Sequence, residues 1–269
     1  MSETRPAGET RPAGDARPAS IDELFPRSIV DLSDAALLEL YAPADRAVPR
    51  LRANFIASAD GSATASGLSG DLGGPADKRV FDLQRRLADV IVVAAGTIRS
   101  EGYGAMRLEA EAAAWRVAAG LAPQPAFGIV SGSLDLDPAS DVFAKAPVRP
   151  LVFTADSAPA DRRAALAGVA DVVSCGADRV DPHRLVAELV ERGLAQQHCE
   201  GGPSLLGSLI EADVLDALSL TLGPTLEGGQ GGRITHRAAE SAPIDLRALA
   251  LDHVLNASGM LLLHYSRVR

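Results

Sequence analysis

The feature that most constrains how this chain can fold is a regular alternation, from about residue 50 onwards, of short apolar runs with longer amphipathic ones. The clearest apolar run is Asp89–Ala95, whose Val-Ile-Val-Val centre has the length and β-branched content of a strand buried on both faces. A helical pattern precedes it over Pro75–Leu87, with the proline suited to the first turn of a helix. Strands that alternate with helices favour a parallel sheet covered by helices. The alternation therefore predicts an α/β fold.

The same alternation continues towards the C-terminus. Further strands are expected at residues 52–58, 127–131, 150–154, 171–174, 196–199 and 217–222, and further helices at 108–119, 158–167, 181–192 and 203–210. The last two runs, 249–255 and 259–267, flank the turn Asn256–Gly259 and predict an antiparallel hairpin beside a mainly parallel sheet. Because aromatic residues are only 4% of the chain while hydrophobic residues are 47%, the core must be built from aliphatic side chains.

The N-terminus differs from this pattern. Three near-repeats of the type Glu-Thr-Arg-Pro-Ala-Gly fill residues 3–20 and lack the bulky apolar side chains that could offset the entropy of ordering. We therefore expect residues 1–25 to be a disordered low-complexity tail. Residues 26–269 show no composition shift that would mark a linker, so a single domain is expected there. Within it, residues 26–48 form an N-terminal extension with a short helix over 32–41, capped by Ser33 or Asp34.

Composition excludes several classes of partner. The formal net charge is −9 and no basic run is present, which argues against binding to nucleic acid. The two cysteines, Cys175 and Cys199, form no C-x-x-C pair and indicate a reducing compartment. Neither a signal-peptide pattern nor a run of about 18 apolar residues occurs, so we expect a cytoplasmic protein without a membrane partner.

Glycine-bearing turns follow three of the expected strands, at Gly96-Thr97, at Ser131–Ser133 and at Glu200–Leu205. Ligands of open α/β sheets bind at the carboxyl ends of the strands, where glycine lets backbone N–H groups approach a phosphate and a following helix adds the positive end of its dipole. Each turn alone is compatible with a plain connection, but the three together indicate a phosphate-bearing cofactor. None is a G-x-G-x-x-G fingerprint or a P-loop.

Two acidic residues stand where a substrate could bind. Asp60 follows the first strand of the main body, and Asp77 lies in the first turn of the helix that ends the long loop from Ser66 to Gly74. Such a loop often closes over a ligand. Asp60 could simply cap a bend, and Asp77 could simply cap its helix. The functional alternative for Asp77 is a carboxylate that faces the ring nitrogens of a heterocycle.

In their order along the chain, four motifs resemble the reductase domain of riboflavin biosynthesis, the C-terminal half of the bifunctional deaminase–reductase. They are Ala57-Ser-Ala-Asp-Gly61, Gly74-Pro-Ala-Asp77, Gly96-Thr-Ile-Arg99 and Glu200-Gly-Gly-Pro-Ser-Leu205, and the resemblance covers roughly residues 50–269. It implies a three-layer dihydrofolate-reductase-like fold and a homodimer. It also implies NADPH as hydride donor and a pyrimidine-type substrate whose ribose is reduced, as in 5-amino-6-(5-phosphoribosylamino)uracil reductases.

The resemblance also implies roles for individual residues. The cofactor would be bound by Ala57, Gly96, Thr97, Ser131, Thr154, Gly201, Gly202, Pro203, Ser204 and Leu205. The substrate would be bound by Asn54, Ser58, Asp60 and Arg107, and the catalytic carboxylates would be Asp71, Asp77 and Glu200. The zinc site of the deaminase half is not expected, because His198-Cys199-Glu200 spells H-x-E without any C-x-x-C. We therefore expect no metal site.

Two departures from the family pattern leave alternatives open. The riboflavin enzymes usually carry a lysine where this chain has Asn54, and a Trp-containing segment where it has Asp71–Gly73. Ile56–Ser58 and Leu72–Asp77 also resemble dihydrofolate reductase, which implies reduction of a dihydrofolate-like pterin held by Asp77. A third possibility is a non-catalytic nucleotide-binding domain, against which the retained Asp60, Asp77 and Glu200 argue.

Overall fold

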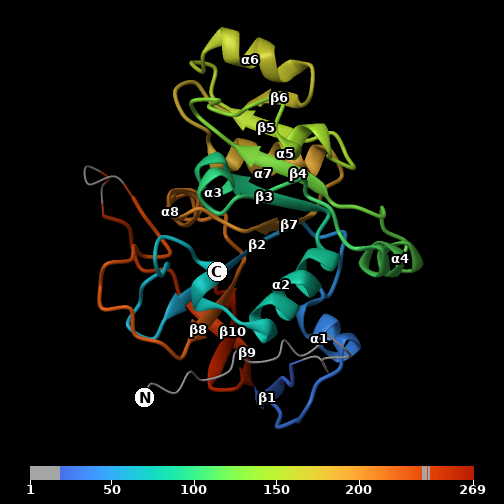
Figure 1. Ribbon diagram of the computed structural model, residues 1–269, viewed down its shortest axis with the longest axis vertical. Coiled ribbons are helices and arrows are strands. Elements are labelled where there is room, and N and C mark those ends of the chain that lie inside the picture. Colours follow the sequence, from blue (N-terminus) through green and yellow to red (C-terminus); the bar gives the residue numbers. More distant parts are fainter. Residues whose placement is uncertain (1–18, 238–240, 242) are drawn as a thin grey trace, which may run out of the picture.

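A single ten-stranded sheet runs through the computed structural model, which describes residues 19–237, 241 and 243–269 (Figure 1). Its strands are β1 (Asp22–Phe25), β2 (Arg50–Ser58), β3 (Val90–Ala94), β4 (Ala126–Val130), β5 (Leu151–Thr154), β6 (Asp171–Ser174), β7 (Gln196–Cys199), β8 (Ala217–Gly223), β9 (Leu249–Ala257) and β10 (Met260–Arg267). The helices are α1 (Asp34–Tyr41), η1 (Gly70–Leu72), α2 (Pro75–Leu87), α3 (Ala95–Ser100), α4 (Ala110–Ala118), α5 (Asp141–Ala144), α6 (Ala160–Ala167), α7 (Pro182–Glu191) and α8 (Pro203–Glu211).

The sheet is parallel through its centre and antiparallel at one side. Its strand order is β1-β9-β10-β8-β2-β7-β3-β4-β5-β6, and every pair from β8 to β6 is parallel. The hairpin β9–β10 adds to β8 in antiparallel fashion, and β1 completes that edge. Strands β2, β3 and β7 are neighbours at the centre, so their carboxyl ends lie side by side.

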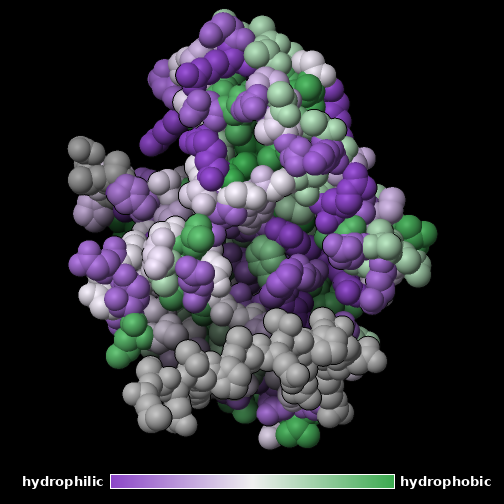
Figure 2. Space-filling view, viewed as in Figure 1, coloured by the Kyte–Doolittle hydropathy of each residue, from purple (hydrophilic) through white to green (hydrophobic). Residues whose placement is uncertain are grey.

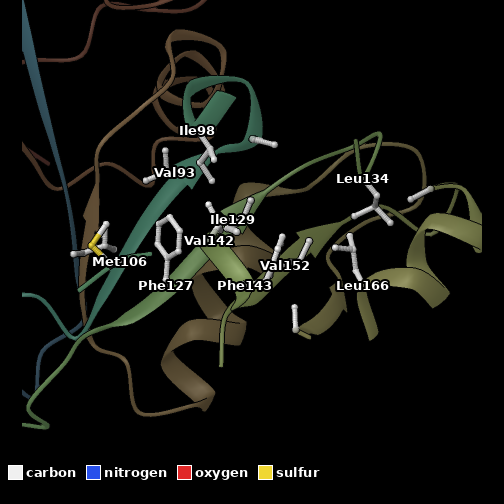
Figure 3. Packing of buried hydrophobic residues seen from close by; sticks show 14 of the residues in the cluster. Val93, Ile98, Met106, Phe127, Ile129, Leu134, Val142, Phe143, Val152 and Leu166 are labelled. Carbon is white, nitrogen blue, oxygen red and sulfur yellow. The ribbon is translucent and has the colours of Figure 1, made fainter. Parts of the chain in front are cut away.

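The strand residues alternate between two apolar cores, which gives three layers. Ile91 and Val93 of β3 pack in a cluster that includes Ile98 of α3 and Leu166 of α6; Figure 3 shows Val93, Ile98, Ile129 and Val152 within it. Val90 and Val92 face the other way, into a cluster with the buried leucines of α7 and α8. Successive side chains of a strand point to opposite faces, so a strand without polar residues needs helices on both sides. The predicted α/β fold, with a mainly parallel sheet and an antiparallel C-terminal hairpin, is confirmed.

The segment before β2 is ordered over more of its length than its composition predicts. The expectation of a disordered tail through residue 25 needs correction, because Asp22–Phe25 form β1 and pair with β9. Ile21 is fully buried, in a cluster with Leu37 of α1 and Leu83 of α2. The low-complexity repeats themselves, up to residue 18, lie outside the described residues. The end of the tail expected from the sequence lies too far along the chain, because one strand of four residues carries little apolar signal.

The N-terminal extension is anchored to α2 by one arginine. Arg79 donates from Nε to Asp34, and from its two terminal nitrogens to the carbonyl oxygens of Ala19 and Leu32. Ser33 caps α1, as predicted, by accepting a hydrogen bond from the amide of Ala36. The extension therefore packs on α2, whose first two turns also form part of the site described below. Among the described residues, no helix has the length and apolar character needed to cross a bilayer.

Candidate functional site

A cavity of about 800 Å³ opens at the carboxyl ends of the central strands. Its walls come from β2, the first half of α2, α3, the loop 63–74 and the turn that precedes α8. Figure 2 shows this face hollowed near its centre, between the positions that α2 and α3 occupy in Figure 1. Most of the lining surface is apolar, while six of the lining residues are glycines and ten carry polar side chains. Apolar walls with convergent polar groups are the usual make-up of a small-molecule site.

A buried ion pair joins two walls of the cavity. Arg85 of α2 donates from Nε and Nη2 to the two carboxylate oxygens of Glu200, at 2.6 and 2.7 Å, and the Glu200 side chain has no exposed surface. Tyr103 adds a third hydrogen bond, from its hydroxyl to Glu200 Oε2 at 3.1 Å. The guanidinium of Arg85 also stacks on Phe81, 4.2 Å from the ring centre. A two-pronged arginine–carboxylate pair fixes orientation as well as distance.

The electrostatics of this pair follow from its burial. Burial alone lowers the pKa of Arg85, but the adjacent Glu200 carboxylate outweighs that effect and raises it above its ordinary value. Burial, followed by the Glu200 charge, raises the pKa of Tyr103, so its hydroxyl stays protonated and donates. Glu200 therefore borders the cavity with a buried carboxylate that accepts three hydrogen bonds from protein donors. Its first function is to hold α2 and Tyr103 against the end of β7.

Besides Glu101, which accepts a hydrogen bond from the Ser69 amide, Asp77 is the acidic group that remains available in the cavity. It lies in the first turn of α2 and shares no ion pair with any described Lys or Arg residue; Thr221 of β8 supplies a hydrogen bond. Burial raises the pKa of Asp77 above its ordinary value, and the Thr221 bond offsets part of that rise. Gly73 passes so close that a Cβ there would lie 2.9 Å from Asp77 Oδ2. An unpaired, partly buried carboxylate is suited to accept hydrogen bonds from a ligand.

The turn after β7 approaches α3 too closely for any side chain at its second glycine. A Cβ on Gly202 would lie 2.4 Å from Thr97 Oγ1, and Gly201 has a φ of +115°, which favours glycine. Gly202 is also the N-terminal boundary of α8, where no side chain caps the free amides. The starts of α3 and α8 thus meet at the cavity with their backbone N–H groups uncapped. We call Gly201, Gly202 and these two helix starts the glycine cradle; its free amides fit the phosphates of a dinucleotide.

The structure brings seven of the proposed site residues to the cavity wall. They are Asn54, Asp77, Thr97, Glu200, Gly201, Gly202 and Pro203. The turn predicted at Gly96-Thr97 is instead the first turn of α3, which begins at Ala95 directly after β3. Gly96, Ser131 and Thr154 lie at or beside the carboxyl ends of β3, β4 and β5, along the same edge of the sheet but outside the cavity.

Several proposed residues are engaged in the scaffold instead. Asp60 accepts from Ser58 and from the amides of Glu227 and Gly228, so it ties the end of β2 to a distant loop. Arg107 donates to the carbonyl of Lys145. Four further proposed residues, Ala57, Asp71, Ser204 and Leu205, do not line the cavity, and Leu205 packs in the core. Asp60 and Arg107 form hydrogen bonds with residues that are far away in the sequence, so their motifs alone could not reveal these contacts.

Three residues that line the cavity lacked a motif, namely Phe81, Lys78 and Tyr103, and so did Arg85, which contacts Phe81 and Glu200 without lining the cavity itself. Arg85 and Phe81 are four residues apart on α2 and therefore share one face, which could have indicated their pairing. Lys78 follows Asp77 and is the only Lys or Arg among the described residues that line the cavity. Tyr103, in the turn after α3, carried no signal that separates it from a surface aromatic residue. No group of three or more His, Cys, Asp or Glu side chains within the described part of the chain is placed to hold a metal ion.

Comparison with known proteins gives consistent results. The family model described as the RibD C-terminal domain matches residues 49–258. The 2,5-diamino-6-ribosylamino-4(3H)-pyrimidinone 5′-phosphate reductase of Methanothermobacter thermautotrophicus is 29% identical over 187 residues, which are 69% of this chain and 82% of that protein. The enzyme of the same name from Archaeoglobus fulgidus is 28% identical over 154 residues, 57% of this chain and 70% of that protein. These names do not favour a pterin substrate or a non-catalytic domain.

A solved structure also resembles this chain closely. It is a pyrimidine reductase-like protein from Corynebacterium diphtheriae, with a TM-score of 0.75 and 28% sequence identity. The match covers 82% of this chain and 92% of the other. The matched region of the family model begins one residue before β2, so the N-terminal extension lies outside it.

Removal of the Glu200 charge should destabilise the protein. Glu200→Gln leaves the Arg85 guanidinium buried without a counter-charge, and we expect the free energy of unfolding in urea to fall by about 3 kcal/mol. The matched control is Glu188→Gln, which removes an exposed pair with Arg192 on α7 and should change stability by less than about 0.5 kcal/mol. Equal effects of the two substitutions would contradict the role given to the Arg85–Glu200 pair.

The charged carboxylate of Asp77 should lower the free energy of unfolding at neutral pH. Because its pKa is raised in the folded state, the folded protein holds this proton more tightly than the unfolded chain, and that advantage is lost as the pH rises through the folded-state pKa. Asp77→Asn should therefore unfold at higher urea concentration than wild type at pH 7. The difference should shrink as the pH falls towards 3.8, the ordinary pKa of an aspartate. A variant less stable than wild type at pH 7 would contradict this.

Proposed function

Because this chain belongs to the RibD C-terminal domain family, we propose that it catalyses the NADPH-dependent reduction of a ribosylaminopyrimidine 5′-phosphate in riboflavin biosynthesis. It is an oxidoreductase, as its reductase relatives indicate. The observation that carries the proposal is the pairing, in one cavity, of a glycine cradle at two helix starts with an unpaired carboxylate at Asp77. The glycine cradle suits a dinucleotide, and the Asp77 carboxylate suits a heterocycle.

The cofactor side of the proposal rests on Thr97 and the turn at Gly201–Pro203. The backbone amides of α3 and α8 would hold the pyrophosphate, and the nicotinamide would extend into the cavity. Gly96, Ser131 and Thr154 continue along the same sheet edge, where the adenosine half would lie. When bound, NADPH supplies the hydride. The choice of NADPH over NADH rests on the family resemblance.

The substrate ring is best matched to Asp77. A carboxylate offers two acceptors side by side, and a 2-amino-4-oxopyrimidine offers two adjacent donors, its N3–H and its 2-amino group. A uracil ring places a carbonyl where the amino group would be, so one carboxylate oxygen would face another acceptor. We therefore propose the 2,5-diaminopyrimidinone named for the archaeal relatives as the preferred substrate, ahead of the uracil.

The ribose phosphate would extend to the cavity mouth, where Lys78 lies. Its side chain is 75% exposed and pairs only weakly with Asp82 on the next turn of α2. A phosphate needs a cation, and Lys78 is the one that the described lining offers. We therefore propose Lys78 of α2 for the phosphate contact rather than Arg107, whose side chain donates to the carbonyl of Lys145.

The remaining residues position the reactants and limit access of water. Phe55, Ile56 and Phe81 form apolar walls, so a bound substrate would displace water from the reacting carbon. Hydride transfer depends on correct approach of the two carbons in a dry site more than on a protein nucleophile. The Arg85–Glu200 pair would keep the α2 wall at a fixed distance from the glycine cradle throughout.

We also propose that the enzyme works in the cytoplasm as a homodimer and has no nucleic-acid partner. The homodimer is proposed from the family resemblance alone. The acidic net charge of −9 supports the absence of a nucleic-acid partner. Both cysteines are free and buried, which suits a reducing compartment.

Substrate preference tests the proposal directly. Purified protein and NADPH would be mixed with the 2,5-diaminopyrimidinone or with the corresponding uracil, and the loss of nicotinamide absorbance followed. We expect kcat/KM to be at least about tenfold higher for the diamino compound, because the uracil leaves an acceptor facing Asp77. Asp77→Asn should narrow this gap, since its amide can donate to the uracil carbonyl. Equal kcat/KM values in wild type would contradict the ring assignment, and no oxidation with either compound would contradict the function.

Substitution of Lys78 should change KM only for phosphorylated substrates. Lys78→Gln should raise KM about tenfold for the 5′-phosphate and leave KM for the dephosphorylated riboside nearly unchanged. Lys145→Gln is the matched control, because Lys145 also pairs with an aspartate four residues away, at the same 2.8 Å, but lies outside the cavity. An equal rise of KM for both substrates would place the phosphate elsewhere.

A further inference from the structure

The helix that carries the proposed recognition groups is covered on its other side by the N-terminal segment, by which we mean residues 19–48. Asp77, Phe81 and Arg85 recur every four residues on α2 and face the cavity or the Glu200 carboxylate. A second face of α2 packs with the N-terminal segment in one buried cluster, which contains Val80, Leu83 and Leu87 together with Ile21, Leu37 and Tyr41. Figure 1 shows α1 of this segment beside α2. One helix therefore joins the substrate wall to the N-terminal segment.

Arg79 binds the first half of α2 to two separate stretches of this segment. Its side chain is only 15% exposed. It donates to Asp34 Oδ1 at 2.7 Å, to the carbonyl oxygen of Ala19 at 2.8 Å and to that of Leu32 at 3.0 Å. A planar guanidinium with three fixed partners holds both position and orientation.

The start of α2 depends on this contact because little else fixes it. Its N-cap residue is Gly74, so no side chain caps the first turn. The loop before it, residues 63–74, contains no strand and only the three-residue helix η1. Arg79 follows Asp77 and Lys78 directly in the chain. The turn that presents these two side chains to the cavity is thus the turn that adjoins the Arg79 contact.

The C-terminal end of α2 is bound to the same segment. The last carbonyl oxygens of an α-helix have no partner within the helix, and cations are favoured beside them. The Leu87 oxygen accepts a hydrogen bond from Arg46 of the N-terminal segment at 2.8 Å. Arg52 of β2 donates to the oxygens of Gln84 and Tyr41, at 2.8 and 3.0 Å, and so joins α2 to the end of α1. The segment therefore holds α2 at both ends.

We propose that the N-terminal segment is a positioning element of the substrate site, and that Arg79 is the positioning residue through which it fixes where Asp77 and Lys78 stand. The segment precedes the matched family region, which begins at residue 49. None of the described residues 19–48 lines the cavity, so any effect of the segment on a ligand must pass through α2. The inference rests on the proposed function for the identity of the substrate.

The two ligands should respond differently when this contact is lost. The pyrimidine is proposed to bind Asp77 and Lys78 on α2, whereas the cofactor is proposed to bind the glycine cradle at the starts of α3 and α8. Arg79 donates to neither of these helix starts. A displaced first turn of α2 therefore changes the pyrimidine site and leaves the cofactor site in place. A general loss of folded protein would instead lower the active fraction and leave both dissociation constants unchanged.

The test is Arg79→Met, which keeps an apolar stem and removes the three hydrogen bonds. We expect the dissociation constant of the diaminopyrimidinone, measured by calorimetry without NADPH, to rise about tenfold, because a misplacement of about 1 Å is enough to disrupt a fitted site. The dissociation constant of NADPH should stay unchanged.

The matched control is Arg149→Met. Arg149 likewise donates to one aspartate, Asp171, and to backbone carbonyl oxygens, but its partners lie at α6 and β6. This control should change neither dissociation constant. A milder variant, Asp34→Asn, weakens one of the three bonds of Arg79 and should raise the pyrimidine constant by a smaller factor. It decides the inference by the same criteria if Arg79→Met does not fold.

The outcomes separate this inference from the proposed function. An unchanged pyrimidine constant in the folded variant, an equal rise of both constants, or a lower kcat with both constants unchanged would overturn the inference. If wild type binds the pyrimidine and NADPH without oxidising the cofactor, the proposed function fails, while the comparison of variants still decides the inference. If wild type does not bind the pyrimidine, both are overturned.

Discussion

The buried pair of Arg85 and Glu200 is the interaction on which the rest of the site depends. Arg85 belongs to α2, and Glu200 directly follows β7, 115 residues later, where it precedes the two glycines of the cofactor cradle. Two short hydrogen bonds of fixed geometry therefore set how far the wall that carries Asp77 and Lys78 stands from the turn that carries Gly201 and Gly202. Two charges taken out of water are costly unless both are matched, which is why the loss of one is expected to be more damaging than the loss of a surface pair.

This arrangement divides the polar groups of the cavity into two kinds. Glu200, Arg85 and Tyr103 satisfy one another and form the frame. Asp77 and Lys78 keep bonding capacity directed at the cavity and form the recognition surface proposed for ring and phosphate. The raised pKa of Asp77 fits this division, because this carboxylate is partly buried and has no ion pair with a described Lys or Arg residue. The partly buried charge of Asp77 lowers the stability of the free protein at neutral pH, and the same carboxylate is proposed to provide selectivity for the substrate ring.

The sequence predicts the fold well and the site only in part. Runs such as Asp89–Ala95 predict the parallel sheet because strands buried on two faces can contain almost no polar residues. The glycine turn at 200–202 is found from its place between strand and helix, and the resemblance supplies its partner at Thr97. The role of Arg85 was not predicted, because nothing in a helical sequence reveals which residue 115 positions away completes its hydrogen bonds. For Asp60 the motif predicted a ligand contact. In the structure, its carboxylate instead accepts a hydrogen bond from the amide of Glu227 and holds that loop in place.

We propose that a single cavity, framed by an intact Arg85–Glu200 pair, holds both the dinucleotide and the pyrimidine. A crystal structure of the protein with oxidised cofactor and the ribityl product would decide this. We expect the pyrophosphate at Gly201–Pro203, the ring edge against Asp77, and Arg85 still bound to both oxygens of Glu200. A structure in which Glu200 has left Arg85 to bind the pyrimidine, or in which the pyrimidine lies away from Asp77, would contradict it.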